Sequence, residues 1–166
     1  MRTSELKGGV SFTRHKVTEI VQSHGRCIGV KATDAATGDE KEIHGNIIVN
    51  ASGAWTNLIA KLAGCEVPLT LSKGSLVITN HRLTDMVINR LRPSSDGDII
   101  VPNEAVCLAG TTSLAVEDPD KITIQPAEVD TIIGEAGRMI PHFNNTRVIR
   151  AFSGVRPLLK SQKLDS

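Results

Sequence analysis

Short apolar runs broken by polar turns fill the first quarter of the chain. Residues 15–22 and 26–33 are rich in β-branched side chains, and the polar turn at residues 23–25 separates them, which predicts a β-hairpin. A second turn at residues 35–39 leads into residues 40–44, a third strand. The pattern therefore predicts a small antiparallel meander.

A denser apolar run at residues 46–51 differs from this pattern and predicts a strand covered on both faces. Ser52 and Gly53 then turn the chain into a helix over residues 54–63, in which the apolar positions fall on one face. Gly64 stands where a helix usually ends. A strand, a turn and a helix in this order form the unit of an α/β layer.

Strand patterns return beyond residue 68. Residues 69–79, 98–101 and 105–112 each predict a strand, while residues 86–91 fit either a strand or a short helix. A cluster of proline, serine, aspartate and glycine at residues 93–97 predicts a turn between them. This part of the chain is therefore expected to form a larger antiparallel sheet.

One amphipathic helix interrupts these strands. Pro126 opens it, its apolar side chains form a single stripe, and Pro141 ends it. Residues 146–153 predict a last strand, which leads into residues 154–158. The helix is expected to lie across the sheet.

These elements predict an α+β fold: an antiparallel sheet with a covering helix, joined to a partial α/β lobe. We expect residues 1–64 to form the partial lobe, residues 65–158 to form the sheet domain, and residues 159–166 to form a polar tail. No G-x-G-x-x-G sequence follows a predicted strand. The chain is therefore expected to hold no complete dinucleotide-binding unit of the Rossmann type.

Composition narrows the possible partners. Nineteen basic and eighteen acidic residues leave a formal net charge of +1, so an anion site must be local, and no broad basic surface is available for nucleic acid. With one tryptophan, three phenylalanines and no tyrosine, the chain offers few rings on which bases could stack. No apolar run approaches the about 20 residues of a membrane span, and the N-terminus shows no secretory signal.

The cysteines and histidines indicate no metal centre. Cys27, Cys65 and Cys107 are far apart and form no C-x-x-C pair, so we expect reduced thiols in a cytoplasmic protein. No two histidines have the spacing of zinc ligands.

The junction between the strand at residues 46–51 and the following helix is the first candidate site. Gly53 would let a ligand approach the backbone closely, and the N–H groups at a helix start attract anionic oxygens. The same residues also fit a tight turn in which Ser52 is the N-cap of the helix.

Arg156, between Val155 and Pro157, is the second candidate. A residue before proline is held in an extended conformation, and the planar guanidinium suits a phosphate or a carboxylate. An arginine at a strand end can equally be solvated or paired with an acidic side chain.

Hydroxyl groups and one lysine form the third candidate set. Lys73 and Ser75 flank a glycine and could meet a phosphate, while Thr111 and Thr112 could offer hydroxyls to a polyol. The alternative is that all four are polar positions at the edge of a sheet.

Six short motifs in a fixed order give the chain a family resemblance. The chain resembles the FAD-dependent, quinone-linked glycerol-3-phosphate dehydrogenases of the anaerobic large-subunit type, within the D-amino-acid-oxidase-like flavoproteins. The resemblance runs from about His15 to Leu158. It rests on His15-Lys16-Val17-Thr18, Val49-Asn50-Ala51-Ser52-Gly53-Ala54-Trp55, Ser72-Lys73-Gly74-Ser75-Leu76, Asp98-Ile99-Ile100-Val101-Pro102, Gly110-Thr111-Thr112-Ser113 and Ser153-Gly154-Val155-Arg156-Pro157-Leu158.

This resemblance implies roles for particular residues. The backbone of Val17 would lie near the adenine of FAD, and Ala51, Ser52 and Gly53 near the phosphates of the cofactor. Arg156 would be the catalytic residue that faces the substrate over the flavin. The substrate-side sheet would contribute Lys73, Ser75, Thr111 and Thr112.

The resemblance also implies a reaction. FAD would take a hydride from C2 of glycerol 3-phosphate, giving dihydroxyacetone phosphate, and the electrons would pass to a quinone. Membrane-anchoring or electron-transfer subunits would be partners, and the enzyme would be cytoplasmic, at the inner face of the cell membrane.

Two segments that the family carries are missing from this sequence: the first glycine-rich βαβ unit and a later glycine-rich segment over the flavin. We therefore expect an internal fragment that alone neither retains FAD nor catalyses the reaction. We also expect Trp55 or Leu58 to be less buried than their types suggest, because their helix would belong to the cofactor domain. Two alternatives stay open: an FAD-dependent oxidase or dehydrogenase of another small hydroxy acid or amino acid, and a non-catalytic binding or structural module.

Overall fold

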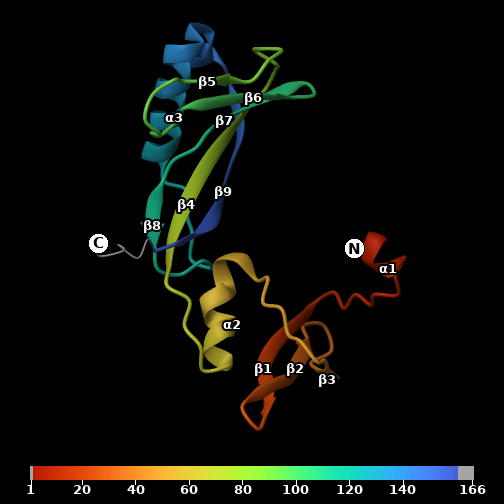
Figure 1. Ribbon diagram of the computed structural model, residues 1–166. Coiled ribbons are helices and arrows are strands. Elements are labelled where there is room, and N and C mark those ends of the chain that lie inside the picture. Colours follow the sequence, from red (N-terminus) through yellow and green to blue (C-terminus); the bar gives the residue numbers. More distant parts are fainter. Residues whose placement is uncertain (1, 161–166) are drawn as a thin grey trace. The chain divides into compact units, whose positions relative to one another are not determined.

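A computed structural model describes residues 2–160 of the chain (Figure 1). They divide into two compact units, and the boundary lies between Val67 and Pro68. Antiparallel sheets and helices make up both units, so the fold is mixed α and β.

The first unit is built on a three-stranded antiparallel sheet in the order β1-β2-β3. A short helix, α1 (Arg2–Glu5), precedes β1 (His15–Ser23), β2 (Arg26–Asp34) and β3 (Glu40–His44). The predicted meander is confirmed, because its turns fall where polar residues and glycine interrupt the apolar runs.

The strand predicted at residues 46–51 is wrong. These residues form no strand, and the side chains of Ile47 and Val49 are 81% and 80% exposed. An apolar run becomes a covered strand only when neighbouring strands supply hydrogen-bond partners on both sides. Within residues 2–160, no strand supplies them to this run.

The predicted helix after this run is present in two pieces, the 3-10 turn η1 (Gly53–Trp55) and the helix α2 (Thr56–Leu62), which packs beside β1. Ala54 and Ala60 are buried. Trp55 and Leu58 are 42% and 53% exposed, which confirms the expectation that these large apolar side chains are less buried than usual.

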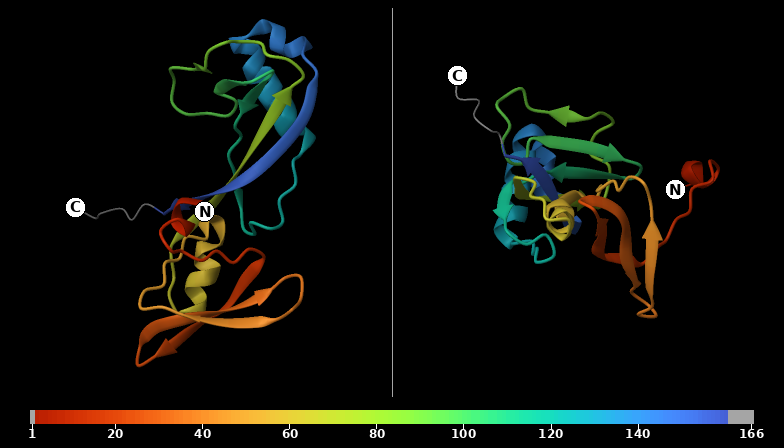
Figure 2. Two further views of the ribbon diagram at one scale, coloured as in Figure 1. Left: turned by 90° about the vertical axis from the view of Figure 1, so that its right-hand side faces the viewer. Right: turned by 60° about the horizontal axis from the view of Figure 1, so that its bottom comes forward.

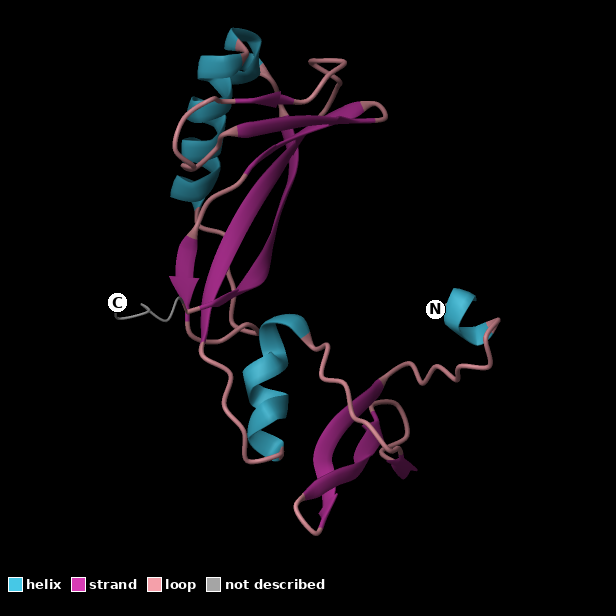
Figure 3. Cartoon of the chain, in the orientation of Figure 1, coloured by secondary structure: helices cyan, strands magenta, loops and turns pink. Residues whose placement is uncertain are grey.

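The second unit holds a six-stranded antiparallel sheet and one long helix (Figures 2 and 3). Most of the predicted elements are confirmed, with residues 86–91 giving only a two-residue strand. Two differences are that β8 was not predicted and that the last strand continues through residues 154–158. The elements are β4 (Leu69–Thr79), β5 (Ile88–Asn89), β6 (Ile99–Asn103), β7 (Val106–Gly110), β8 (Leu114–Val116), α3 (Pro126–Met139), the 3-10 turn η2 (Pro141–Asn145) and β9 (Val148–Leu159).

Strand β4 is the centre of this sheet. Along its whole length it pairs with β9, from Leu69 opposite Leu159 to Thr79 opposite Val148. The other edge of β4 is shared: β7 pairs with residues 76–78, and β8 pairs with residues 71–73. The ladder along this edge is therefore broken between β7 and β8.

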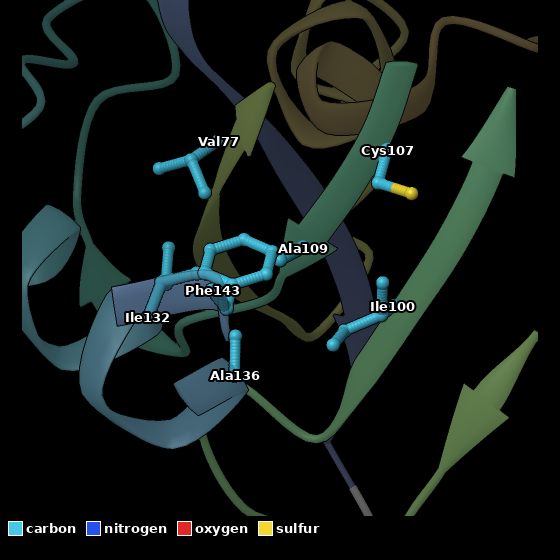
Figure 4. Packing of buried hydrophobic residues seen from close by; sticks show 7 residues of the cluster. All are labelled: Val77, Ile100, Cys107, Ala109, Ile132, Ala136 and Phe143. Carbon is cyan, nitrogen blue, oxygen red and sulfur yellow. The ribbon is translucent and has the colours of Figure 1, made fainter. Parts of the chain in front are cut away.

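Helix α3 covers one face of the sheet and closes the core (Figure 4). Ile132 and Ala136 lie one helical turn apart on its buried side, as the predicted apolar stripe requires. All members of the core cluster have no exposed surface: Val77, Ile100, Cys107, Ala109, Ile132, Ala136 and Phe143.

Ile132→Ala should lower the unfolding free energy of the second unit by about 2–5 kcal/mol, because it removes three carbons from a fully buried site. Leu159→Ala is the control, since Leu159 is 73% exposed and its truncation should cost within about 0.5 kcal/mol. Urea unfolding of both variants measures the difference. Equal losses would contradict the placement of the core.

Candidate functional site

The break between β7 and β8 is held by side chains. The Thr112 hydroxyl accepts a hydrogen bond from the Ser75 backbone N–H at 3.0 Å, and the Thr112 N–H donates to the Ser75 carbonyl at 3.3 Å. On the neighbouring residues, the hydroxyls of Ser72 and Ser113 are 2.9 Å apart. Thr112 therefore takes the place that a paired strand residue would otherwise fill beside Ser75.

Arg156 reaches this break from β9. Its Nη2 donates to the Thr112 carbonyl at 2.8 Å, and its Nη1 lies 3.5 Å from the Thr111 hydroxyl. The side chain crosses β4 at Gly74, where a Cβ would stand 2.8 Å from Nη2 and 3.1 Å from the Thr112 carbonyl oxygen. Glycine at position 74 thus leaves room for the guanidinium to cross the strand.

The face that carries Arg156 is the one opposite α3. Cross-strand neighbours share a face, and in the β4–β9 register Ser72 lies opposite Arg156 and Leu76 opposite Phe152. Arg156 and Phe152 are exposed. A guanidinium has five N–H donors, and within residues 2–160 that of Arg156 makes two hydrogen bonds, so it has further donors to offer an anion. This face therefore carries the held guanidinium of Arg156 and the exposed ring of Phe152.

Glu128 of α3 lies on the opposite face of the same break. One of its oxygens, Oε1, accepts hydrogen bonds from the hydroxyls of Ser75 at 2.7 Å and Thr112 at 3.1 Å. The other, Oε2, accepts from Lys73 Nζ at 2.6 Å and from the Gln125 N–H at 2.9 Å. With 6% of its surface exposed, Glu128 is a buried carboxylate with a full set of partners.

These partners decide the charge state of Glu128. Burial by itself raises the pKa of a carboxyl, because it penalises the charged form. The hydrogen bonds from Gln125, Lys73, Ser75 and Thr112 act in the other direction and lower the pKa of Glu128 from 4.5 to about 2. Glu128 is therefore ionised at neutral pH and forms a buried ion pair with Lys73.

The structure separates the five residues predicted for catalysis and substrate binding into two groups. Arg156 and Thr111 lie together at the break. Lys73, Ser75 and Thr112 are 4%, 0% and 2% exposed, and their side chains bond to Glu128 inside the unit. Direct substrate contact by these three side chains stays a prediction, and their observed contacts are internal.

Glu128 was missed by the sequence reasoning, although a signal was available. It precedes Ile132 and Ala136 at spacings of four residues, so it lies on the buried stripe of the helix. It also stands at the third position after Gln125, where its side chain and that of Gln125 form a capping box.

The residues predicted for the cofactor lie in the first unit. Val17 is half-buried on β1 opposite Ala32, next to a register shift in the ladder. Ala51 and Gly53 are exposed, and Gly53 has a φ of +58° with nothing within 4 Å of where a Cβ would stand. Close approach of a ligand to this backbone is therefore sterically open.

The alternative prediction, a tight turn with Ser52 as N-cap, is confirmed for the position of Ser52 at the start of η1 but not for a side-chain capping bond. Ser52 precedes η1, but its hydroxyl makes no capping bond and instead donates to Asn50 Oδ1 at 2.6 Å. Asn50 Nδ2 in turn donates to the Thr56 carbonyl at 2.9 Å. The Asn50 side chain therefore fixes the turn, because it links the residues before and after η1.

Two general features of the described residues bear on the class of site. Among residues 2–160, no group of three or more histidine, cysteine, aspartate or glutamate side chains is arranged to hold a metal ion. None of the helices in that range is long and apolar enough to cross a membrane.

Comparison with known proteins identifies the family. Residues 1–165 match the family model of the FAD dependent oxidoreductases. The chain belongs to this family. One subunit of the anaerobic glycerol-3-phosphate dehydrogenase of Escherichia coli K12 is 39% identical over 97% of the chain. The corresponding protein of Haloferax volcanii is 39% identical over 93% of the chain.

The relatives are longer than the chain. The match covers 30% of the Escherichia coli protein and 28% of the Haloferax volcanii protein, so the chain spans less than a third of either. Among solved structures, the glycerol-3-phosphate dehydrogenase of Bacillus halodurans, complexed with FAD, is 25% identical with a TM-score of 0.81 over 96% of this chain and 34% of that protein. Glycine oxidase of Bacillus cereus has the same fold, at 18% identity and a TM-score of 0.73 over 94% of this chain and 41% of that protein.

The charge of Glu128 predicts an acid-sensitive step in stability. Because the pKa of Glu128 is lowered on folding, its ionised form stabilises the folded unit above about pH 5, and this contribution is lost as the pH falls from 4.5 toward about 2. The difference in unfolding free energy between the wild type and Glu128→Gln should therefore shrink over this range. Urea unfolding of both proteins at a series of pH values measures it. A difference that stays constant down to pH 2 would contradict the buried ion pair.

Proposed function

We propose that the chain is part of an FAD-dependent dehydrogenase that oxidises glycerol 3-phosphate to dihydroxyacetone phosphate. The observation that carries the proposal is the exposed guanidinium of Arg156, held by the Thr112 carbonyl on an otherwise open face. A planar, permanently charged fork with free N–H donors suits a phosphate or carboxylate group. The names of the relatives that are 36% to 39% identical support glycerol 3-phosphate as the substrate.

In this proposal Arg156 and Thr111 bind and orient the substrate. The guanidinium neutralises negative charge on the substrate, and the Thr111 hydroxyl offers a hydrogen bond beside it. Gly74 keeps the backbone beneath the guanidinium free of side chain. Holding the reacting carbon in one orientation is the main contribution that such residues make to the rate.

The first unit is proposed to contribute part of the FAD site. Val17, Ala51, Ser52 and Gly53 would hold the cofactor, Val17 through its backbone near the adenine and the other three near the phosphates. The open space in front of Gly53 and the exposed backbone at Ala51 fit a phosphate group at this turn. FAD, when bound, supplies the hydride acceptor, and the chain supplies binding and orientation.

The two units correspond closely to the two proposed binding roles, one for the cofactor and one for the substrate. We propose that residues 1–64 are a segment of the FAD-binding domain, that residues 65–158 are the substrate-binding domain, and that residues 159–166 are a polar tail. The partial α/β character of the first segment is part of this proposal. It is supported by the apolar side chains of Ile47 and Val49, which are exposed here and which a neighbouring strand of a complete domain would cover.

A hollow in the first unit supports the same view. It has a volume of about 610 Å³ and is lined by Arg26, Cys27 and Ile28 of β2 and by residues 44–48. The chain spans 30% of the length of its Escherichia coli relative. We propose that further chain of the complete enzyme fills this hollow and covers the exposed run beside it.

The proposal also covers the electron acceptor and the cellular location of the complete enzyme. The complete enzyme would pass electrons to a quinone through membrane-anchoring or electron-transfer subunits, and it would lie in the cytoplasm, peripherally at the inner face of the cell membrane. This part rests on the family resemblance. Reduction of a soluble quinone analogue by the complete enzyme with glycerol 3-phosphate tests it.

The chain alone should not retain FAD, because it lacks the glycine-rich turn that cradles the pyrophosphate. Purified from cells with ample flavin, it should show no flavin absorbance band. Free FAD added during refolding should be lost on gel filtration. A yellow protein with a stoichiometric flavin would contradict this prediction.

Arg156→Lys should lower kcat/KM for glycerol 3-phosphate in the complete enzyme by about 30- to 1,000-fold, because lysine keeps the charge but loses the fork. One such contact is worth roughly 2–4 kcal/mol in a transition state. Steady-state kinetics and thermal melting on the same preparation measure the effect on rate and on stability.

Arg150→Lys is the matched control for this experiment. Arg150 is an exposed arginine on the same strand and the same face, opposite Ile78. Its substitution should leave the kinetics unchanged. Unaltered kinetics in Arg156→Lys would show that Arg156 is not part of the active site. If the wild-type enzyme prefers another hydroxy acid or an amino acid, glycerol 3-phosphate is not its substrate.

A further inference from the structure

The two oxygens of Glu128 have separate partners. Oε2 accepts a hydrogen bond from the Gln125 N–H, which caps α3, and another from Lys73, which completes the ion pair. Oε1 accepts from the hydroxyls of Ser75 and Thr112, which belong to the broken edge of the sheet. Capping and charge pairing therefore involve Oε2, while the bonds of Oε1 tie the carboxylate to the sheet beside the break.

Thr112 connects Glu128 to Arg156. Its hydroxyl donates to Glu128 Oε1 at 3.1 Å on one face of the sheet, and its carbonyl accepts from Arg156 Nη2 at 2.8 Å on the other. The same hydroxyl accepts the Ser75 N–H at 3.0 Å, so it is held by one donated and one accepted hydrogen bond. With 2% of its surface exposed, Thr112 has little freedom to change its orientation.

We propose that Glu128 is a positioning residue for Arg156, acting through Thr112. Glu128 holds the Thr112 hydroxyl, which together with the two bonds to the Ser75 backbone anchors residue 112, and the anchored residue presents the carbonyl that holds the guanidinium. The inference rests on the proposed function, because it takes Arg156 as the group that faces the substrate. It adds a residue on the far side of the sheet to the set that determines substrate affinity.

Other contacts at the break are consistent with this role. Of the two hydrogen bonds that Arg156 donates, the one to the Thr112 carbonyl, at 2.8 Å, is shorter than the one to the Thr111 hydroxyl, at 3.5 Å. Gly74 places no side chain between the carbonyl and the guanidinium. The low pKa of Glu128, about 2, keeps its carboxylate an acceptor throughout the neutral range.

Thr112→Val tests the proposal in the complete enzyme. Valine keeps the shape and the backbone carbonyl but removes the hydroxyl that Glu128 holds. We expect kcat/KM for glycerol 3-phosphate to fall about 10- to 100-fold, because displacing a substrate-binding group by about 1 Å can cost a reaction about 100-fold in rate. Thr112→Ser, which keeps the hydroxyl, should restore most of the loss.

Thr79→Val is the matched control. Thr79 is a fully buried threonine at the end of β4, and its hydroxyl bonds to the His81 carbonyl at 2.7 Å and accepts the Cys107 N–H at 2.9 Å. These bonds involve neither Glu128 nor Arg156. Its substitution should lower the melting temperature as Thr112→Val does but leave the kinetics of the folded enzyme unchanged.

The result is read against Arg156→Lys in the same assay. If Arg156→Lys lowers kcat/KM and Thr112→Val behaves like Thr79→Val, the positioning role is overturned and the proposed function stands. If Arg156→Lys has no effect, the proposed function itself fails. If both single variants lose activity and the double variant loses less than their product, Thr112 acts through Arg156.

A second variant covers the case in which Thr112→Val gives no folded enzyme. Thr112→Cys fills a similar space, but a thiol donates and accepts only weakly. Its loss of kcat/KM should fall between those of Thr112→Ser and Arg156→Lys. Wild-type kinetics in Thr112→Cys would overturn the proposal.

Discussion

The second unit depends on the hydrogen bonds of Glu128, a carboxylate buried between its helix and its sheet. Removing it from water is costly unless its oxygens are fully paired. Four groups donate the hydrogen bonds that the carboxylate requires: Lys73 and Ser75 on the central strand, Thr112 at the broken edge and the Gln125 N–H at the start of α3. The register of β4, the start of the helix and the course of the chain between β7 and β8 are tied to one carboxylate.

Local patterns predicted most of the fold. The meander, the long strand β4 and the amphipathic helix α3 could be read from turns, β-branched runs and the spacing of apolar side chains, since each of these signals acts within a few residues. Residues 46–51 could not, because a covered strand depends on neighbours that the described chain does not provide. Strand β8 was missed for a related reason: it has three residues, and its pairing with β4 is a contact between segments about forty residues apart.

The candidate site was predicted unevenly for physical reasons. Arg156 could be singled out because Pro157 restricts its backbone, which is a local signal. Which face of the sheet a residue occupies depends on the register, so Lys73 and Ser75 were grouped with Arg156 although they face α3. Glu128 became visible only when helix and sheet were in place, because its importance comes from partners more than fifty residues away in the chain.

The break between β7 and β8 also bears on how such a face can change during evolution. Thr111 and Thr112 are consecutive, yet one hydroxyl lies beside the guanidinium on the open face and the other is locked to Glu128 in the interior. Under the proposed function, anchoring and recognition would be divided between these adjacent residues. Substitution at Thr111 would then change the contacts offered to the proposed ligand, while Thr112 keeps the break in its folded form. In a segment with this division of roles, the exposed position can change without altering the contacts of the core.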